Sequence, residues 1–326
     1  MSYLASLNPL NLVAALPGCV AQGLIWGIMA LGVFVTFRLL DFADLTVDGS
    51  FATGGAVTIM LTLAGMPVGL SLFIAVLAGL AAGLVTGLLH TKLGIPPILS
   101  GILVQIALYS VNLHIMGMAA NKAINVNNYT LLISARNITT AILVALVFVA
   151  VLIALLYWFF GTEIGSAIRA TGCNPAMSKA NGININTRKV LALAISNGIV
   201  ALSGGLMAQY QGYSDINMGR GAIVIGLAAV IIGEVFGNAV AGRRMNFMLR
   251  MIFVVLGGVI YYIVIGIVLW LKLNSNDLKL FTAVIVAIFL AVPYLKAGRS
   301  SSFAKAAKNS QAALKQRSGE SAKEEK

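Results

Sequence analysis

Residues 138–160 read ITTAILVALVFVAVLIALLYWFF, a stretch without a charged side chain. A helix crosses the hydrocarbon core of a bilayer with about 20 apolar residues, so this stretch is long enough to span a membrane. The rest of the chain is similar: of its 326 residues, 59% are hydrophobic and 10% are charged, and its mean hydropathy is +0.94. A soluble domain carries about 25% charged residues. The composition excludes a free soluble enzyme, a disordered regulator and a secreted disulfide scaffold, and it predicts an all-α, polytopic membrane protein.

Further apolar runs lie on both sides of this stretch. Their approximate limits are 18–37, 49–64, 67–89, 96–117, 190–210, 221–241, 251–271 and 278–295. The run at 49–64 is short and the last one is marginal. We therefore predict about nine transmembrane helices, with a range of eight to ten, in a membrane domain that covers residues 18–296. Residues 1–17 form a separate N-terminal segment, either an interfacial helix or a frayed terminus.

The distribution of Lys and Arg predicts the orientation. With nine spans threaded alternately, most of the 22 basic residues fall on the side of the C-terminus. The other side receives five, namely Lys122, Arg136, Arg220, Lys272 and Lys279. Cytoplasmic loops carry the excess of basic residues, so we predict an outer N-terminus and an inner C-terminus. The basic cytoplasmic tail, residues 297–326, either contacts anionic lipid headgroups or is a solvated segment that sets the topology.

The chain also carries the pattern of an internal repeat. Residues 23–60 and 193–230 each combine an apolar run, a Gly-rich interruption and a second apolar run. The interruptions are Asp48-Gly49-Ser50 and Met218-Gly219-Arg220-Gly221. The first span then corresponds to the sixth, the second to the seventh and the third to the eighth, an offset of five spans. Because five is an odd number, the two copies would have opposite orientations in the membrane. Inverted repeats are common in transporters, where the pathway follows the repeat interface. We expect these interruptions to be partial helix breaks near the membrane surface; ordinary surface loops are the alternative.

Several chemical motifs are missing from the sequence. No glycine is followed by lysine, so the ATP-binding loop G-x-x-x-x-G-K-[ST] does not occur. There is no His-Glu-x-x-His or G-x-S-x-G motif, and His90 and His114 are far apart. Cys19 and Cys173 offer neither a disulfide framework nor metal-ligand spacing. We expect no enzymatic activity, no metal and no cofactor in this chain, and no nucleic-acid partner.

Glu234 is the acidic residue that lies well inside a predicted span. Ionisable groups are costly in a membrane and are often kept there for function. Glu234 is therefore a candidate gate or subunit contact, or a carboxylate capped by a neighbouring helix end. An ion-coupled secondary transporter that uses Glu234 is the alternative function, followed by a channel or a membrane-embedded assembly factor.

The long inner loop at 161–189 is too polar to span a membrane. Asn174 and Pro175 are typical of a helix start, with Asn as the N-cap and Pro in the first helical position. A short helix is predicted from there through Ala180, ending at Gly182. A short cytoplasmic helix of this kind can dock into a groove of a partner protein.

Three boxes together resemble the permeases of ABC importers of the branched-chain amino acid and ribose type. The boxes are 168–177 with 181–184, 40–56, and 218–221 with 228–234. Residues 40–56 are similar to the family's Asn-Phe-Ala-x-Gly box followed by Gly-Ala. Asp41 and Asp44 stand where branched-chain members have Asn and His. This difference argues against a branched-chain solute, and for a side branch associated with amino acids or related small solutes, aromatic ones among them.

The resemblance implies a mechanism and a set of partners. Two permease subunits would form the pathway as a homodimer, or with a homologue, in the bacterial inner membrane. Two ABC ATPase subunits would dock on the 161–189 loops and would bind the ATP and Mg. An extracytoplasmic substrate-binding protein would deliver the solute, and the permease would alternate between inward-open and outward-open states.

Three groups of candidate site residues follow from these patterns. The ATPase-coupling loop comprises Arg169, Gly172, Asn174, Pro175, Ala176, Met177, Ala180 and Gly182. The pathway and its helix breaks comprise Phe42, Asp48, Gly49, Gly54, Gly55, Gly219, Gly221 and Glu234. Asp215 and Arg220, on the predicted outer face, either dock the binding protein or form a local ion pair.

Overall fold

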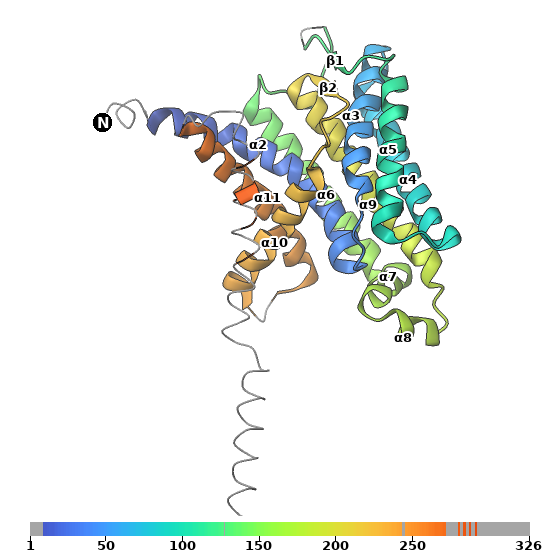
Figure 1. The fold of residues 1–326 in the computed structure, drawn as a ribbon. Coiled ribbons are helices and arrows are strands. Elements are labelled where there is room, and N and C mark those ends of the chain that lie inside the picture. Colours follow the sequence, from blue (N-terminus) through green and yellow to red (C-terminus); the bar gives the residue numbers. More distant parts are fainter. Residues whose placement is uncertain are drawn as a thin grey trace, which may run out of the picture. The chain divides into compact units, whose positions relative to one another are not determined.

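The computed structural model describes residues 9–271, except 127 and 243–244, and a few isolated positions between 280 and 291. The described chain is almost entirely helical (Figure 1). Its elements are α2 (Pro9–Val33), the π-helix η1 (Phe34–Leu39), α3 (Thr46–Leu63), α4 (Val68–Leu93), α5 (Pro97–Ile115), β1 (Asn121–Ala123), α6 (Ile138–Gly161), α7 (Glu163–Cys173), α8 (Pro175–Ala180), α9 (Ile185–Gln211), β2 (Tyr213–Asp215), α10 (Ala222–Ala241) and α11 (Phe247–Trp270).

The prediction of an all-α, polytopic membrane protein is confirmed. Among the described residues, seven candidate spans are long and apolar enough to cross a membrane: α2 with η1, α4, α5, α6, α9, α10 and α11. The predicted run at 49–64 is helix α3, which is not among the seven because glycines, threonines and Asp48 dilute its apolar content. The predicted last span, 278–295, and the basic tail, 297–326, lie outside the described residues apart from isolated positions.

Helices α2 and α9 form the centre of the described body. In each of them, 78% of the most apolar 18-residue window is buried, against 22% in α5 and in α6. The two central helices are joined where serine hydroxyls of α9 donate to backbone carbonyls of α2. Ser196 Oγ donates to the Gly32 oxygen and Ser203 Oγ donates to the Ile25 oxygen, each over 2.7 Å. Such contacts require close approach of the two backbones, which small residues allow.

The first helix of each half of the chain, α2 and α9, packs against the later helices of the other half. Helix α2 packs against α10 and α11, whereas α9 packs against α3 and α4. Figure 1 shows α2 and α9 running in opposite directions through the body. In the predicted repeat α2, α3 and α4 correspond to α9, α10 and α11, so this exchange is the arrangement that such a repeat would give.

Glycine seams hold these helix pairs together. Gly23 and Gly27 of α2 lie against the α11 backbone, and Gly79, Gly83 and Gly87 of α4 lie against α9. At each of these positions an added Cβ would collide with the neighbouring helix. The glycines, spaced four residues apart in each helix, therefore form close helix–helix contacts.

The short connections gather at opposite ends of the body (Figure 1). Strands β1 and β2 pair antiparallel, with Asn121 opposite Asp215, and this joins the segments 118–137 and 211–220 that we predicted to share one face. Helices α7 and α8 lie at the other end.

The predicted boundary at residue 17 is wrong as a helix limit: α2 begins at Pro9 and continues through Pro17.

The predicted helix break at Asp48-Gly49-Ser50 is also wrong. These residues form the first turn of α3, and the interruption lies earlier, in η1 and in the irregular segment 40–45. The reason is a local cap: Asp44 Oδ1 accepts a hydrogen bond from the Thr46 backbone nitrogen over 2.9 Å. A side-chain acceptor satisfies an otherwise unpaired amide at a helix start. Asp41, with φ 55°, turns the chain just before this cap.

Candidate functional site

Helix α8 has the geometry that the sequence predicted within the 161–189 loop, whereas the 11-residue helix α7 before it was not predicted. Asn174 caps α8, with its Oδ1 accepting from the Met177 backbone nitrogen over 3.0 Å, and Pro175 holds the first helical position. The helix ends at Ala180, and Gly182 turns the chain with φ 78°. Gly is favoured at such a left-handed position because it has no Cβ. The predicted helix and both of its limits are therefore confirmed.

The α7–α8 pair packs against α9, and two further contacts link α7 to η1 and to α11. Gly172 packs directly on the backbone carbonyl of Leu39 at the end of η1. The Arg169 guanidinium lies 5.4 Å from the centre of the Phe247 ring at the start of α11, a cation–π contact. The loop is thereby anchored on both η1 and α11.

The face of α8 that points away from the helical body is exposed in this chain. Ala176, Lys179 and Ala180 are exposed, and Met177 is 63% exposed, whereas Ser178 is buried. Exposed Met is common on surfaces that bind partner helices or grooves, because its side chain is flexible. The face that the sequence proposed for a partner is thus free of intramolecular contacts with the rest of the described chain.

The second interruption, 218–221, meets α3. The Asp48 carboxylate, in the first turn of α3, accepts hydrogen bonds from the Gly221 nitrogen over 2.9 Å and the Ile223 nitrogen over 2.8 Å. Gly221, the N-cap of α10, offers no side chain of its own. Asp48 therefore supplies the cap of α10 from another helix, and a carboxylate is favourable at the positive end of a helix dipole.

The glycines of the two predicted breaks have different surroundings. Gly219 packs on the backbone carbonyl of Asp48, and a Cβ on Gly49 would lie 2.9 Å from the Leu108 side chain of α5. Gly221 has φ 84° and nothing within 4 Å of an added Cβ. Gly219 and Gly49 are thus close-packing positions, and Gly221 is required for its backbone conformation.

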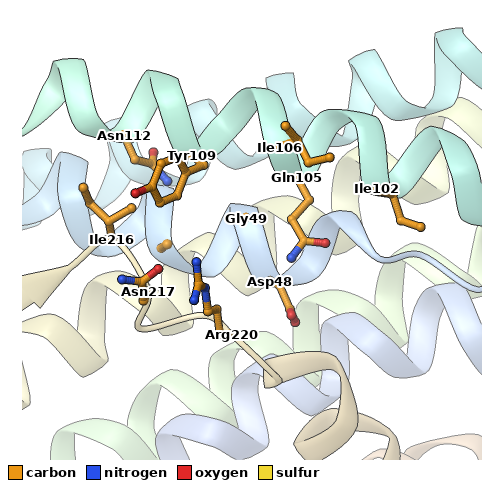
Figure 2. Close-up of a pocket in the computed structure, with 11 residues that line it drawn as sticks. Asp48, Gly49, Ile102, Gln105, Ile106, Tyr109, Asn112, Ile216, Asn217 and Arg220 are labelled. Atoms are coloured by element: carbon orange, nitrogen blue, oxygen red, sulfur yellow. The ribbon is translucent and has the colours of Figure 1, made fainter. Parts of the chain in front are cut away.

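A cavity of about 360 Å³ lies beside this junction. It is bounded by α3, by α5 and by the connection at residues 216–221, hereafter the β2–α10 segment. Its lining residues are Asp48, Gly49, Ala52, Ile102, Gln105, Ile106, Tyr109, Asn112, Ile216, Asn217 and Arg220. Figure 2 shows Arg220 and Asn217 reaching from the β2–α10 segment toward α5, and Gln105 reaching from α5 toward Asp48. The cavity thus combines one acid, one base and several amides with an apolar wall.

Asp48 and Gly49 are the predicted pathway residues that line this cavity; Phe42, Gly54, Gly55, Gly219, Gly221 and Glu234 do not. Gly54 packs on the Ala201 carbonyl of α9, and Gly55 lies against Met218 and Ser214. Phe42 is buried with its ring centre 5.2 Å from that of His90. These residues hold the helices that shape the cavity.

Glu234 is separated from the cavity and is paired. Its Oε1 lies 2.7 Å from Arg38 Nε of η1, and its side chain is 22% exposed. The pair links α10 to the same π-helix on which Gly172 rests. The partner is an arginine side chain and not a helix end, so the alternatives considered for Glu234 stay predictions.

Arg220 and Asp215 form no ion pair in the described part of the chain, so the local-pair alternative is wrong. Asp215 Oδ1 accepts from the Asn217 backbone nitrogen over 2.7 Å, and Asp215 Oδ2 lies 3.5 Å from Asn121 Nδ2. These bonds shape the turn after β2. Arg220 instead lines the cavity.

Sequence reasoning missed the polar face of α5. Gln105, Tyr109 and Asn112 are spaced by four and three residues, so they share one face of the helix. Polar residues at helical spacing inside an apolar run were the available signal. Reasoning from sequence also missed a buried network between α3 and α9, in which Asn197 donates to Asp44 over 2.7 Å and accepts from Ser50 over 2.6 Å.

The fold and these sites define a multi-pass membrane protein that keeps a mixed polar cavity within a helical body, as solute permeases do. Its family is shown by sequence comparison. Residues 16–293 match the family described as branched-chain amino acid transport system / permease component, and the chain belongs to that family. The expected family resemblance is thereby confirmed, and the chain is a multi-pass protein of the inner membrane.

The matches to two relatives cover most of this chain and most of each relative. The chain is 39% identical over 270 residues, 83% of this chain and 88% of the relative, to a protein of Clostridioides difficile (strain R20291) named "Tyrosine transport system permease protein". It is 30% identical over 273 residues, 83% of this chain and 94% of the relative, to an uncharacterized protein of Rickettsia prowazekii (strain Madrid E). No solved structure matches the chain.

Proposed function

We propose that this chain is the membrane-spanning subunit of an ATP-driven importer for an amino acid, and that L-tyrosine is the first solute to test. The similarity to a relative named as a tyrosine transport permease carries this proposal. The departures at Asp41 and Asp44, noted above, agree with a solute other than a branched-chain amino acid. A cavity with an acidic and a basic wall suits a solute that carries both charges.

The coupling to ATP would pass through α8. A separate ABC ATPase would bind the ATP and Mg and would contact the exposed face of Ala176, Met177 and Ala180. Movement of α8 would be transmitted to η1 through Gly172 and to α11 through Arg169, because these are the contacts that anchor the loop. Two copies of the permease would alternate between inward-open and outward-open states, and an extracytoplasmic binding protein would deliver the solute.

The orientation proposed for this subunit places α7 and α8 in the cytoplasm and the paired strands outside. Their location at opposite ends of the body supports it (Figure 1). A cysteine introduced at exposed Ala135 should react with an impermeant maleimide on spheroplasts, and one at exposed Met177 should react only after lysis. The reverse pattern would invert the topology.

The experiment that tests the function is reconstitution of the permease with its candidate ATPase and binding protein in proteoliposomes. We expect L-tyrosine uptake that requires ATP and all three components. Uptake by the permease alone, driven by an ion gradient, would instead establish a secondary transporter. Genes for an ATPase and a binding protein beside the permease gene would identify the components to use.

Substitution in α8 tests the coupling contact. Ala176→Arg and Ala180→Arg should abolish solute-stimulated ATP hydrolysis, because a long charged side chain would occupy the docking face. Ala135→Arg is the matched control, since Ala135 is exposed near the opposite end, between α5 and α6. All three variants should retain the elution profile and melting temperature of the wild type. Normal ATP hydrolysis in both α8 variants would refute the assignment of α8 as the dock.

A further inference from the structure

We infer that the cavity between α3, α5 and the β2–α10 segment binds the zwitterionic head of an α-amino acid, with Arg220 facing its carboxylate and Asp48 facing its ammonium group. This inference rests on the proposed function and adds to it a site on the permease itself. It also gives Arg220 a role different from docking a binding protein.

The charge arrangement carries the first step. Arg220 and Asp48 both line the cavity, and they form no ion pair with each other in the described structure. Arg presents N–H donors in a fork that matches a carboxylate. An ionised carboxylate has about four lone-pair positions, and Asp48 uses two of them for the backbone nitrogens of Gly221 and Ile223. Asp48 therefore keeps acceptor capacity for an ammonium group.

A buried amide supplies independent support. Asn112 is 1% exposed and lines the cavity, and its Oδ1 has no hydrogen-bond partner in the described structure. Buried polar atoms are paired in the large majority of cases, so an unpaired acceptor at a cavity wall indicates a donor that comes from outside the chain. Asn112 lies seven residues, about two helical turns, along α5 from Gln105, which faces Asp48 (Figure 2), so the donor to Asn112 is a different group from the ammonium group beside Asp48. Gln105 adds a further amide on the same wall (Figure 2).

The apolar lining and the size define the rest of the solute. Ile102, Ile106 and Ile216, with the Tyr109 ring, provide a wall for an apolar or aromatic side chain. Small-molecule sites measure about 300–1,000 Å³ and are mostly apolar, with a few placed polar groups. A cavity of about 360 Å³ lies at the small end of that range. The chemical class that fits is therefore a single amino acid with an apolar or aromatic side chain, rather than a peptide or a sugar chain.

The position of the cavity fits a transport site. Its α5 residues, 102–112, occupy the middle of the candidate span Pro97–Ile115. The first turns of α3 and α10 meet at the same place, where Asp48 accepts hydrogen bonds from the Gly221 and Ile223 nitrogens. Transporters commonly place solute near the middle of the bilayer, where helix starts point toward charged groups.

A labelling assay tests the site directly. Asn217→Cys, in a chain whose Cys19 and Cys173 are replaced by alanine, places a thiol on the exposed side of the cavity. In the reconstituted complex L-tyrosine should slow its reaction with a maleimide, whereas a thiol at Ala135 should react at the same rate with and without L-tyrosine. Tyramine, which lacks the carboxylate, and 3-(4-hydroxyphenyl)propionic acid, which lacks the ammonium group, should each protect only at about tenfold higher concentration, the equivalent of one interaction of about 1.4 kcal/mol.

Arg220→Gln supplies the decisive comparison. It should raise the L-tyrosine concentration needed for half-protection by about tenfold, as for one lost interaction. The tyramine concentration needed for half-protection should not change, because tyramine has no carboxylate. The two solutes should then protect at equal concentrations. Lys122→Gln removes a positive charge from β1, outside the cavity lining, and should preserve the discrimination. If Arg220 had a purely structural role, the substitution would instead weaken protection by both solutes equally.

The outcomes separate this inference from the proposed function. If the wild-type complex imports L-tyrosine but L-tyrosine never protects Asn217→Cys, the site is wrong and the function stands. If Arg220→Gln leaves the preference for L-tyrosine over tyramine intact, the assignment of Arg220 to the carboxylate is wrong. If the wild-type complex shows no ATP-driven uptake of L-tyrosine, the proposed solute itself is refuted.

Discussion

Helices α6 and α9 are both long candidate spans, yet they have opposite compositions and opposite surroundings. The more apolar α6 exposes Leu143, Leu146, Val151 and Trp158. The central α9 buries Ser196, Asn197, Ser203 and Gln209 among its glycines. In a membrane, lipid tails are as apolar as leucine, so helices associate through close packing and hydrogen bonds between small and polar residues. The most apolar helix can therefore remain at the periphery while the less apolar one forms the core.

The same substitution in both helices should give the largest contrast. A Cβ on Gly204 of α9 would overlap the Phe51 backbone carbonyl, whereas one on Gly161 at the end of α6 meets nothing within 4 Å. We expect Gly204→Leu to destabilise the fold by more than ~3 kcal/mol, because overpacking costs ~1–3 kcal/mol even where neighbours can shift. The measurements are the yield of folded protein and its melting temperature in detergent. Equal behaviour of Gly204→Leu and Gly161→Leu would show that α9 is not close-packed.

The buried hydrogen bonds of α9 should give the next largest effect. Asn197→Leu removes the amide that bonds Asp44 and Ser50, and we expect a loss of about 2–3 kcal/mol because buried partners are left unpaired. Adding Asp44→Asn should recover part of that loss, since a neutral amide is less costly to bury than a carboxylate. Thermal melting of the single and double variants measures the coupling. Strictly additive losses would mean that the two side chains do not interact.

Substitutions on the exposed face of α6 should have the smallest effect. Leu146→Ala and Trp158→Ala remove side chains that are 52% and 70% exposed. Exposed positions outside special features usually change stability by less than about 0.5 kcal/mol. Melting temperature and the dimer fraction in a mild detergent should both stay at the wild-type values. A drop in the dimer fraction would show that this face of α6 contacts the second permease copy.

How well each feature could be predicted from the sequence depends on how far apart in the sequence the interacting residues lie. Helix α8 was predicted with both of its limits because its cap, its proline and its terminating glycine all lie between Asn174 and Gly182. The spans of α4, α6 and α9 followed from apolar length alone. The orientation in the membrane is still a prediction, because the signals that set it are not contacts within the chain.

The junction at Asp48 could not be predicted in the same way. Its carboxylate bonds backbone nitrogens 173 and 175 residues away, so the local pattern Asp48-Gly49-Ser50 was interpreted as a break when it is the start of a helix. Likewise Arg220 lies five positions from Asp215, and a local pair was one of the two roles that we considered for it. The fold instead directs Arg220 to α5, which belongs to the other half of the chain.

The exchange of first helices has a consequence for the order of assembly during synthesis. Val33 ends α2, and its main partner α11 begins only at Phe247. At about 5–20 residues per second, this gap takes on the order of ten to forty seconds of translation. Throughout that interval α2 lies in the bilayer without the helix that covers Gly23 and Gly27. Helix α9, in contrast, follows α3 and α4 in synthesis, so it can pack against both at once. Helix α2 can join α9 through Ser196 and Ser203, but its α11 face is covered last.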